Sequence, residues 1–379
     1  MKKVFVLAQN IVSPLGNTAK ENFEALCAGN TAVAIHNDVS RSPVPFCAAL
    51  MDPAFFKNTP ASFTPFEALT AASMADVIRQ AKIDPADPDT TWILSTTKGN
   101  IGLLEGQPVT RELKEAVGLT VSARKISEYF GFKHTPLIVS HACISGTLAI
   151  ITARRILETG KYKTVVVAGA DLITRFILSG FQSFHAVSEV LCKPFDANRN
   201  GINLGEAAAS VVLSTVPSAE ADRITISGGG VSNDANHISG PSRTGAELYM
   251  AIGRAMKEAA VDAEAIDFIS AHGTATIYND DMESRAITLA GLQSVPVNSM
   301  KGYYGHTLGA AGLLETVIGI ESLKQQIIIP TMGFETPGTA APIHVCSALT
   351  KTPAKAFLKT ASGFGGCNAA IVVVKSVKG

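Results

Sequence analysis

Residues 136–168 constrain the fold most, because they read as a strand, a tight turn, a helix and a second strand. Pro136–Ser140 (PLIVS) is a short apolar run typical of a buried strand. From Ile144 onward apolar side chains recur at the spacing of a mostly apolar helix, and Thr164–Ala168 (TVVVA) is a second buried strand. Alternation of buried strands with helices predicts a layered α/β protein.

Cys143 lies where the turn becomes the helix, in the segment SHACISGTLAI. The first turn of a helix presents free N–H groups and the positive end of the helix dipole. Both stabilise a thiolate, so the position predicts a lowered pKa for Cys143 and a nucleophile near neutral pH. The alternative is a small cysteine that fills the core. The position and the histidines further along the chain favour the nucleophile.

Two histidines stand beside predicted strands or helices in the second half of the chain. His272 follows the strand Ile266–Ala271, and His306 stands in the first turn of a predicted helix, Gly305–Lys324. A lone histidine is more often a structural group, but α/β proteins place their ligands in loops at the carboxyl ends of strands. A cysteine can accept an acyl group from a thioester, and two neutral imidazoles can donate hydrogen bonds to a carbonyl that becomes an enolate. A cysteine protease would need only one histidine and an Asn or Asp to orient it.

The alternation of strands and helices restarts after residue 216. Pro136–Ala168 and Val295–Ile329 share one order of elements, and each has a reactive residue between a strand and a helix. Val216–Ala221 (VPSAEA) is the most linker-like segment. The sequence therefore predicts a duplicated α/β unit, with one half over 1–215 and the other over 216–379. Further predicted strands are Lys3–Ala8, Thr91–Ser95, Ala207–Ser214, Ile224–Gly228, Val295–Ser299, Phe357–Ala361 and Ala369–Val374.

Composition excludes several classes of function. The 379 residues carry 32 basic and 32 acidic side chains, and this zero net charge argues against a nucleic-acid partner. The longest apolar runs have the length of strands, so no transmembrane helix is predicted, and the first apolar run ends too early for a signal peptide. The six cysteines show no metal-binding spacing, so we expect no metal and a reducing, cytoplasmic setting.

Several segments in order resemble the β-ketoacyl-acyl-carrier-protein synthases, the elongating condensing enzymes of the thiolase superfamily. The resemblance covers essentially the whole chain. It rests on the opening NIVSPLGNTAKENFEALCAGNTAV, on CKPFDANRNGINLGEAAASVVL, on the His272 loop HGTATIYNDDMES, on KGYYGH ending at His306, and on the closing GFGGCN. It implies a thiolase-like fold of α-β-α-β-α layers with two pseudo-symmetric halves.

The resemblance also implies roles for individual residues. Cys143 would accept the acyl group, and His272 and His306 would stabilise the enolate formed when a malonyl thioester loses carbon dioxide. The backbone N–H groups of Cys143 and Phe364 would form an oxyanion hole, and Phe364 would also gate the acyl pocket. Lys301 would form an ion pair with Glu283 or Asp280 and hold the histidine loops. Glu315 would be a supporting residue behind the site. Thr274 and Thr276 would contact the pantetheine arm.

The implied reaction is a decarboxylating Claisen condensation between an acyl group on Cys143 and a malonyl-acyl carrier protein. It needs no metal or organic cofactor, since the phosphopantetheine belongs to the carrier protein. The implied partners are an acyl carrier protein and a second subunit, either identical or related. Arg199, Asp196 and Glu206 are expected to hold loops rather than to take part in catalysis.

The chain departs from the family pattern at several positions and in the length of its first half. Asn200, Ala207, Ala275 and Cys367 replace the usual residues, and the segment before Cys143 is shorter than is typical. These departures leave open a synthase dedicated to a polyketide or aryl-polyene pathway, with or without a partner subunit. A non-catalytic partner subunit would have lost the cysteine, and a thiolase would use Cys367 as a base. The cysteine and the paired histidines outweigh both.

Overall fold

The computed structural model describes residues 2–217, 222–236 and 240–377. Five strands of the first half and five of the second repeat one arrangement. The first five are β1 (Phe5–Val12), β4 (Thr90–Ser95), β5 (Leu137–Val139), β6 (Thr164–Asp171) and β8 (Ala207–Ser214), and they lie in the order β5-β4-β6-β8-β1. The second five are β9 (Asp222–Asn233), β10 (Phe268–Ser270), β11 (Val297–Asn298), β14 (Ala356–Gly363) and β15 (Cys367–Val377), in the order β11-β10-β14-β15-β9.

Both sets follow the same topology when their strands are counted along the chain. In each set the strands lie side by side in the order third, second, fourth, fifth and first. The fifth strand is antiparallel to both of its neighbours. The two sets join edge to edge between β1 and β9 through the pair Phe5–Thr225. This repeated topology confirms the predicted duplication.

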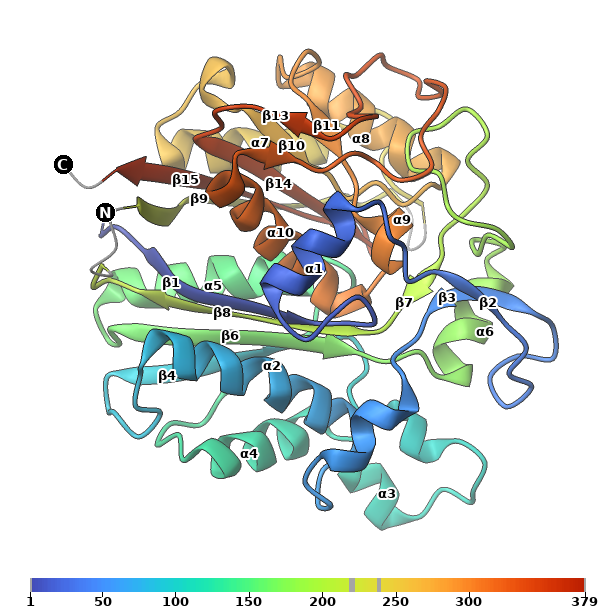
Figure 1. The fold of residues 1–379 in the computed structure, drawn as a ribbon, viewed down its shortest axis with the longest axis vertical. Helices are drawn as coiled ribbons and strands as arrows, with labels where there is room; N and C mark the ends of the chain where they lie inside the picture. Colours follow the sequence, from blue (N-terminus) through green and yellow to red (C-terminus); the bar gives the residue numbers. More distant parts are fainter. Residues whose placement is uncertain (1, 218–221, 237–239, 378–379) are drawn as a thin grey trace.

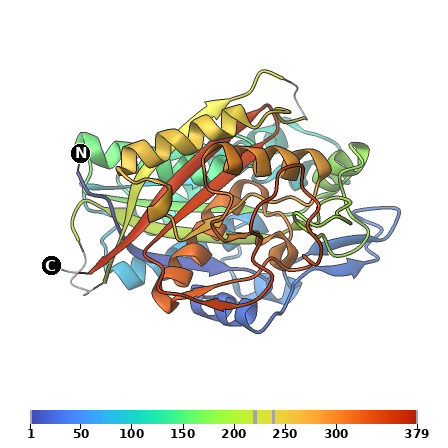
Figure 2. The same ribbon diagram turned by 90° about the horizontal axis from the view of Figure 1, so that it is seen from above.

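Helices form three layers around the two sets of strands (Figure 1). The helices α5 (Ser145–Thr159) and α10 (Ala311–Gln325) lie between the sets and contact strands of both. On the outside, α2 (Pro65–Ala81) and α4 (Leu119–Phe130) cover the first set. The second set is covered by α7 (Ala246–Ala259), which runs along β9 and β15 in Figure 2, and α8 (Ile277–Leu289) packs beside it. The expected α-β-α-β-α layering is therefore confirmed.

The remaining elements are short. The helices are α1 (Ala19–Cys27), α3 (Arg111–Ala116), α6 (Arg175–Ser183) and α9 (Lys301–Tyr304). The strands β2 (Ala34–His36), β3 (Phe46–Ala49) and β7 (Leu204–Gly205) form a small sheet, and β12 (Ile327–Ile328) pairs with β13 (Thr350–Lys351). Single 3₁₀ turns occupy Pro53–Asn58, Ile101–Leu104, Ala263–Ala265 and Leu308–Ala310.

The two central helices approach each other closely because glycines line their contact. A methyl group on Gly146 of α5 would lie 2.6 Å from the backbone nitrogen of Leu313 in α10. A methyl group on Gly312 would overlap the hydroxyl of Thr147. This contact brings the turn before α5, and with it Cys143, against the second half of the chain.

Some sequence predictions differ from the structure in extent. The strand β1 runs on to Val12, beyond the predicted end at Ala8, because its second half pairs with β8. The strand β5 was expected to be buried, but it lies at the edge of the sheet and leaves Leu137 44 % exposed. The segment after the His272 loop was not predicted as a helix and forms α8.

The long helix predicted from Gly305 begins only at Ala311. Residues 218–221 of the linker-like segment lie outside the described residues, and the division into domains 1–215 and 216–379 stays a prediction. Among the residues that the structure covers, no helix combines the length and the apolar character needed to cross a membrane.

Candidate active site

Cys143 lies in the tight turn between β5 and α5. The helix begins at Ser145, so the cysteine stands two residues before it. The preceding Ala142 has φ +46°, a left-handed conformation that L-residues adopt at a cost of order 1–3 kcal/mol. The Ser145 hydroxyl accepts a hydrogen bond from the N–H of His141 (2.7 Å) and donates to the Ala142 carbonyl (2.6 Å), which closes the turn. Cys143 thereby lines a cavity of about 410 Å³.

The environment of the thiol contradicts the predicted low pKa. Burial raises the pKa of Cys143 to about 12, and the nearby Cys367 acts in the same direction. Lys301 and the backbone N–H of Phe364, which points at the sulfur, lower the pKa but do not offset burial. The cysteine is 8 % exposed, and an apolar site disfavours the charged form more than a nearby helix end favours it. Cys143 is therefore a thiol at neutral pH.

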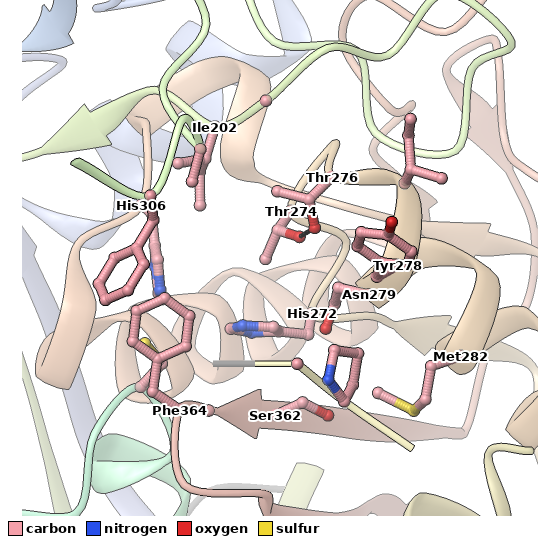
Figure 3. A pocket seen from close by; sticks show the side chains of 18 of the residues that line it. Ile202, His272, Thr274, Thr276, Tyr278, Asn279, Met282, His306, Ser362 and Phe364 are labelled. Carbon is pink, nitrogen blue, oxygen red and sulfur yellow. Dashed lines mark hydrogen bonds between the residues drawn. The ribbon is translucent and has the colours of Figure 1, made fainter. Parts of the chain in front are cut away.

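His272 and His306 face each other across the cavity (Figure 3). Their ring centroids are 5.2 Å apart and the rings are nearly perpendicular, at 82°. Burial lowers the pKa of both imidazoles to well below 6.5, and the positive charge of Lys301 lowers it further. Nδ1 of His272 and both ring nitrogens of His306 have no hydrogen-bond partner in the described part of the chain. Both rings are therefore neutral and free to donate to a substrate.

Carboxylates on α8 hold the loop that carries His272. Glu283 accepts hydrogen bonds from the N–H groups of His272 and Gly273, both at 2.8 Å. Asp280 accepts from the N–H groups of the next two residues, at 2.9 and 3.1 Å. Asp280 and Glu283 thus hold this loop through its backbone N–H groups, and their supporting role in the reaction stays a prediction.

Lys301 does not pair with either of those carboxylates, which corrects the sequence prediction. Its ammonium group forms an ion pair with Glu315 and donates to the carbonyl oxygen of His272 at 3.0 Å. Glu315 faces Lys301 because α10 packs between the two sets of strands. The sequence motif suggested a partner for Lys301 on α8. The approach of Glu315 depends on how α10 packs in the fold, and no local motif shows this.

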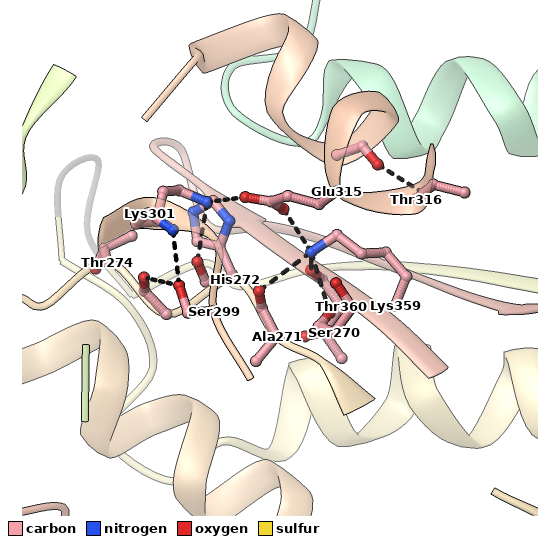
Figure 4. A network of polar contacts seen from close by, with 12 residues as sticks. Ser270, Ala271, His272, Thr274, Ser299, Lys301, Glu315, Thr316, Lys359 and Thr360 are labelled. Carbon is pink, nitrogen blue, oxygen red and sulfur yellow. Dashed lines mark hydrogen bonds and ion pairs between the residues drawn. The ribbon is translucent and has the colours of Figure 1, made fainter. Parts of the chain in front are cut away.

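A second buried lysine, Lys359, was missed by the sequence analysis. Its ammonium group lies 2.6 Å from the other carboxylate oxygen of Glu315 (Figure 4). The signal in the sequence is a lysine within the strand AFLKTASG, which is otherwise small or apolar. A buried lysine in such a strand requires a counter-ion.

Phe364 and two threonines line the same cavity (Figure 3). The ring of Phe364, 39 % exposed, stacks on Phe181 at a centroid distance of 5.7 Å and meets Phe184 edge-on at 5.5 Å. The hydroxyls of Thr274 and Thr276 lie 2.8 Å apart. The structure therefore brings together all the predicted substrate-facing residues at one cavity.

Other predictions concern residues near the site. Asp196 accepts backbone hydrogen bonds from Glu335 (2.8 Å), and Arg199 forms an ion pair with Asp281 (2.7 Å), as expected for residues that hold loops. Burial raises the pKa of Cys367 to about 11, which argues against a thiolase-type base at this position. Over the described ranges, no group of three or more His, Cys, Asp or Glu side chains is arranged to hold a metal ion.

A cysteine and two neutral imidazoles at one cavity of a doubled, thiolase-like α/β fold define a condensing acyltransferase. The particular family follows from the sequence. The model of the β-ketoacyl synthase N-terminal domain matches residues 1–219, and that of the β-ketoacyl synthase C-terminal domain matches residues 224–335. The chain belongs to the β-ketoacyl synthase family.

Relatives of two kinds lie within this family. The chain is 27 % identical to "3-oxoacyl-[acyl-carrier-protein] synthase 2" of Coxiella burnetii over 98 % of both chains. It is 30 % identical to "Putative polyketide beta-ketoacyl synthase 1" of Streptomyces cyaneus over 74 % of this chain and 70 % of that protein. These relatives agree with an enzyme that condenses acyl units into β-ketoacyl products.

The fold is also that of a solved ketosynthase. A ketosynthase from Xenorhabdus doucetiae, in complex with its chain length factor, superposes with a TM-score of 0.87 at 24 % identity, over 99 % of this chain and 98 % of that one. At this identity the likeness concerns the fold alone.

Proposed function

We propose that the enzyme extends a Cys143-bound acyl group by two carbons, with malonyl-acyl carrier protein as donor, and releases β-ketoacyl-acyl carrier protein. The observation that carries this proposal is a pair of neutral imidazoles, with ring nitrogens that have no partner among the described residues, lining the same cavity as Cys143. Neutral donors suit an oxygen that gains charge during the reaction, because they stabilise the enolate without a prior ion pair to the substrate.

In the first half-reaction, Cys143 exchanges with the thiol of an acyl thioester. The sulfur attacks the carbonyl carbon, the bond to the carrier sulfur breaks, and the proton of the Cys143 thiol ends on the released carrier thiol. The N–H of Phe364, which acts on the Cys143 thiol, would donate to the oxyanion together with the N–H of Cys143.

In the second half-reaction, the malonyl carboxylate leaves as carbon dioxide, and the electron pair forms an enolate. His272 and His306 donate hydrogen bonds to the enolate oxygen. The carbanion then attacks the acyl carbon on Cys143, the carbon–sulfur bond breaks, and the Cys143 sulfur takes up a proton. Thr274 and Thr276 contact the pantetheine arm, and Phe364 gates the acyl pocket.

An edge of the large sheet supports a proposal about assembly. The strand β11 is covered because Val297 exchanges backbone hydrogen bonds with residues 344 and 346. Among the strands that the structure describes, β5 pairs only with β4. An uncovered edge strand recruits another strand, and a symmetric dimer buries it with its own copy. We therefore propose a homodimer whose subunits meet at β5, with a related second subunit as the alternative. Separately, we propose that the enzyme acts in the cytoplasm.

The test separates the two half-reactions. The protein is incubated with a panel of acyl-carrier-protein thioesters and followed by intact mass, then supplied with malonyl-acyl carrier protein. The expected result is an adduct on the wild type and its absence in Cys143→Ala. The variants His272→Ala and His306→Ala should still acylate but release carbon dioxide at least about a hundredfold more slowly. No adduct from any acyl donor would overturn the proposal, and the preferred donor distinguishes a fatty-acid from a polyketide substrate.

A further inference from the structure

Lys359 lies outside the motifs on which the family resemblance rests, yet it is wholly buried beside the active site. It stands in the middle of β14, on the strand that ends at the Phe364 loop. Burying a lysine ammonium costs several kcal/mol unless it is paired and hydrogen-bonded. The site therefore contains a costly cation to which the proposed mechanism assigns no role.

The ammonium group of Lys359 joins its own strand to the backbone that carries His272. It donates to the carbonyl oxygen of Thr360 at 2.6 Å, to that of Ser270 at 3.1 Å and to that of Ala271 at 3.2 Å. Lys301 binds the next carbonyl oxygen, that of His272, at 3.0 Å. Three consecutive carbonyls at the end of β10 are thus held by two ammonium groups (Figure 4).

Glu315 joins the two lysines into one unit. One of its carboxylate oxygens pairs with Lys301, and the other lies 2.6 Å from Lys359. Lys301, Glu315 and Lys359 form what we call the lysine bridge, and it carries a net positive charge. The other ionisable groups that face Lys359 are Glu283, His272 and His306.

The charge of Lys359 acts on both imidazoles. A cation in a dry site disfavours a second cation nearby, and Lys359 lowers the pKa of His272 and of His306 in addition to burial and Lys301. Neutral imidazoles matter for condensation, because an imidazolium would bind the malonyl carboxylate in the ground state and could protonate the carbanion before it attacks. A cation at position 359 therefore favours the second half-reaction, because it disfavours protonation of the two imidazoles.

We propose that Lys359 is a positioning residue of the condensation step: through the lysine bridge it holds the backbone that carries His272 and keeps a positive charge buried at the active site. This inference rests on the proposed function. It predicts that the charge at position 359 matters for the second half-reaction and that acyl transfer to Cys143 does not depend on it.

The experiment compares Lys359→Met, which removes the charge, with Lys359→Arg, which keeps it. Lys324→Met is the control, since Lys324 lies at the exposed end of α10 and pairs with Glu321 at 3.7 Å. Acylation of Cys143 is followed by intact mass, and release of carbon dioxide and of β-ketoacyl product is followed between pH 5 and pH 9. Acylation also reports that each variant is folded.

The condensation rate, plotted against pH, should fall toward acidic pH where the imidazoles gain a proton, and we call this fall the acidic limb. In Lys359→Met the acidic limb should move to higher pH by about one unit, so that the rate near it falls about tenfold. In Lys359→Arg and Lys324→Met the limb should stay in place, even where the Arg variant turns over more slowly. A Met variant with the limb of the wild type, or an Arg variant with an equal shift, would mean that Lys359 only packs, and would overturn the inference.

Glu315→Gln tests the same idea if Lys359→Met does not fold. It leaves both cations of the lysine bridge unneutralised, so the acidic limb should move to lower pH, and an unchanged limb or the opposite shift overturns the inference. A wild-type protein that neither acylates nor condenses would instead refute the proposed function itself.

Discussion

Cys143 keeps its proton at neutral pH, and this determines how fast small electrophiles react with it. Burial raises the pKa of the thiol to about 12, so the thiolate fraction rises with pH throughout the accessible range. Modification of Cys143 by iodoacetamide should therefore be slow at neutral pH and accelerate about tenfold per pH unit, without a plateau up to about pH 10. Rates are measured by mass spectrometry with assignment of the modified peptide.

A short blocked peptide with one cysteine is the control for this measurement, because its rate levels off near an ordinary thiol pKa of about 8.5. A plateau for Cys143 below that pH would show that the helix end outweighs burial, as the sequence alone had suggested. The sign of the effect is thus decided by one titration.

Residues that act through their own chemistry were predictable from the sequence, whereas the partners that hold them were not. Cys143, His272 and His306 stand in local motifs, and the structure places them at one cavity. The partner predicted for Lys301 was wrong, and the buried Lys359 was not predicted at all. Both depend on Glu315, which reaches the site only because α10 is buried between two sets of strands.

At the scale of elements, the close contact of α5 and α10 positions the nucleophile. The replacement Gly146→Ala puts a methyl group 2.6 Å from the backbone nitrogen of Leu313, so the two helices must move apart. We expect the free energy of unfolding to fall by about 2 kcal/mol, in line with other overpacked cores. Acylation of Cys143 should slow as well, because the turn before α5 shifts with the helix.

The matched control is Gly253→Ala in α7, where an added methyl group meets nothing within 4 Å. A helical Gly→Ala change with free space should raise the free energy of unfolding by about 0.5–1 kcal/mol. Urea denaturation of the two variants compares them directly. Equal effects in both would show that the helix contact tolerates a methyl group and that α5 is not held by close packing.

Elements were predicted best where the local pattern is strong and least well where a distant partner decides. The strand Ala207–Ser214 has the predicted bounds, because its small and branched apolar residues leave no alternative. The helix α8 was missed because its exposed and buried positions show little apolar periodicity: it carries Asp280 and Glu283 inward to bind backbone N–H groups. A buried helix face that carries polar groups lacks the apolar periodicity by which a packed helix is predicted from sequence.

At the scale of the whole molecule, the duplication was visible in the order of elements but its geometry was not. The sequence indicated a repeat because each half has a reactive residue between a strand and a helix. The common strand order of the halves rests on pairings such as β1 with β8, which join residues about two hundred positions apart. No local pattern specifies such pairings, because they are set when apolar faces pack.

The free edge at β5 yields the last prediction, which concerns assembly. Leu137 in β5 is 44 % exposed, and Tyr129 on the neighbouring α4 is 58 % exposed, so this edge presents apolar side chains together with unpaired backbone groups. In Leu137→Lys each subunit of a symmetric dimer would bring a charge to the contact, and edge lysines oppose strand pairing.

Sedimentation should therefore show the wild type at twice the mass of the 39.6 kDa chain and Leu137→Lys largely at the single-chain mass. The control is Leu289→Lys at the end of α8. Leu289 is somewhat more exposed, at 53 %, but lies on the outer helix layer of the other half, so this variant should stay dimeric. A Leu137→Lys protein that remains dimeric would move the subunit contact away from β5. The wild type could instead be monomeric alone and double its mass only when a related subunit is added. That result would identify β5 as the contact with the related subunit.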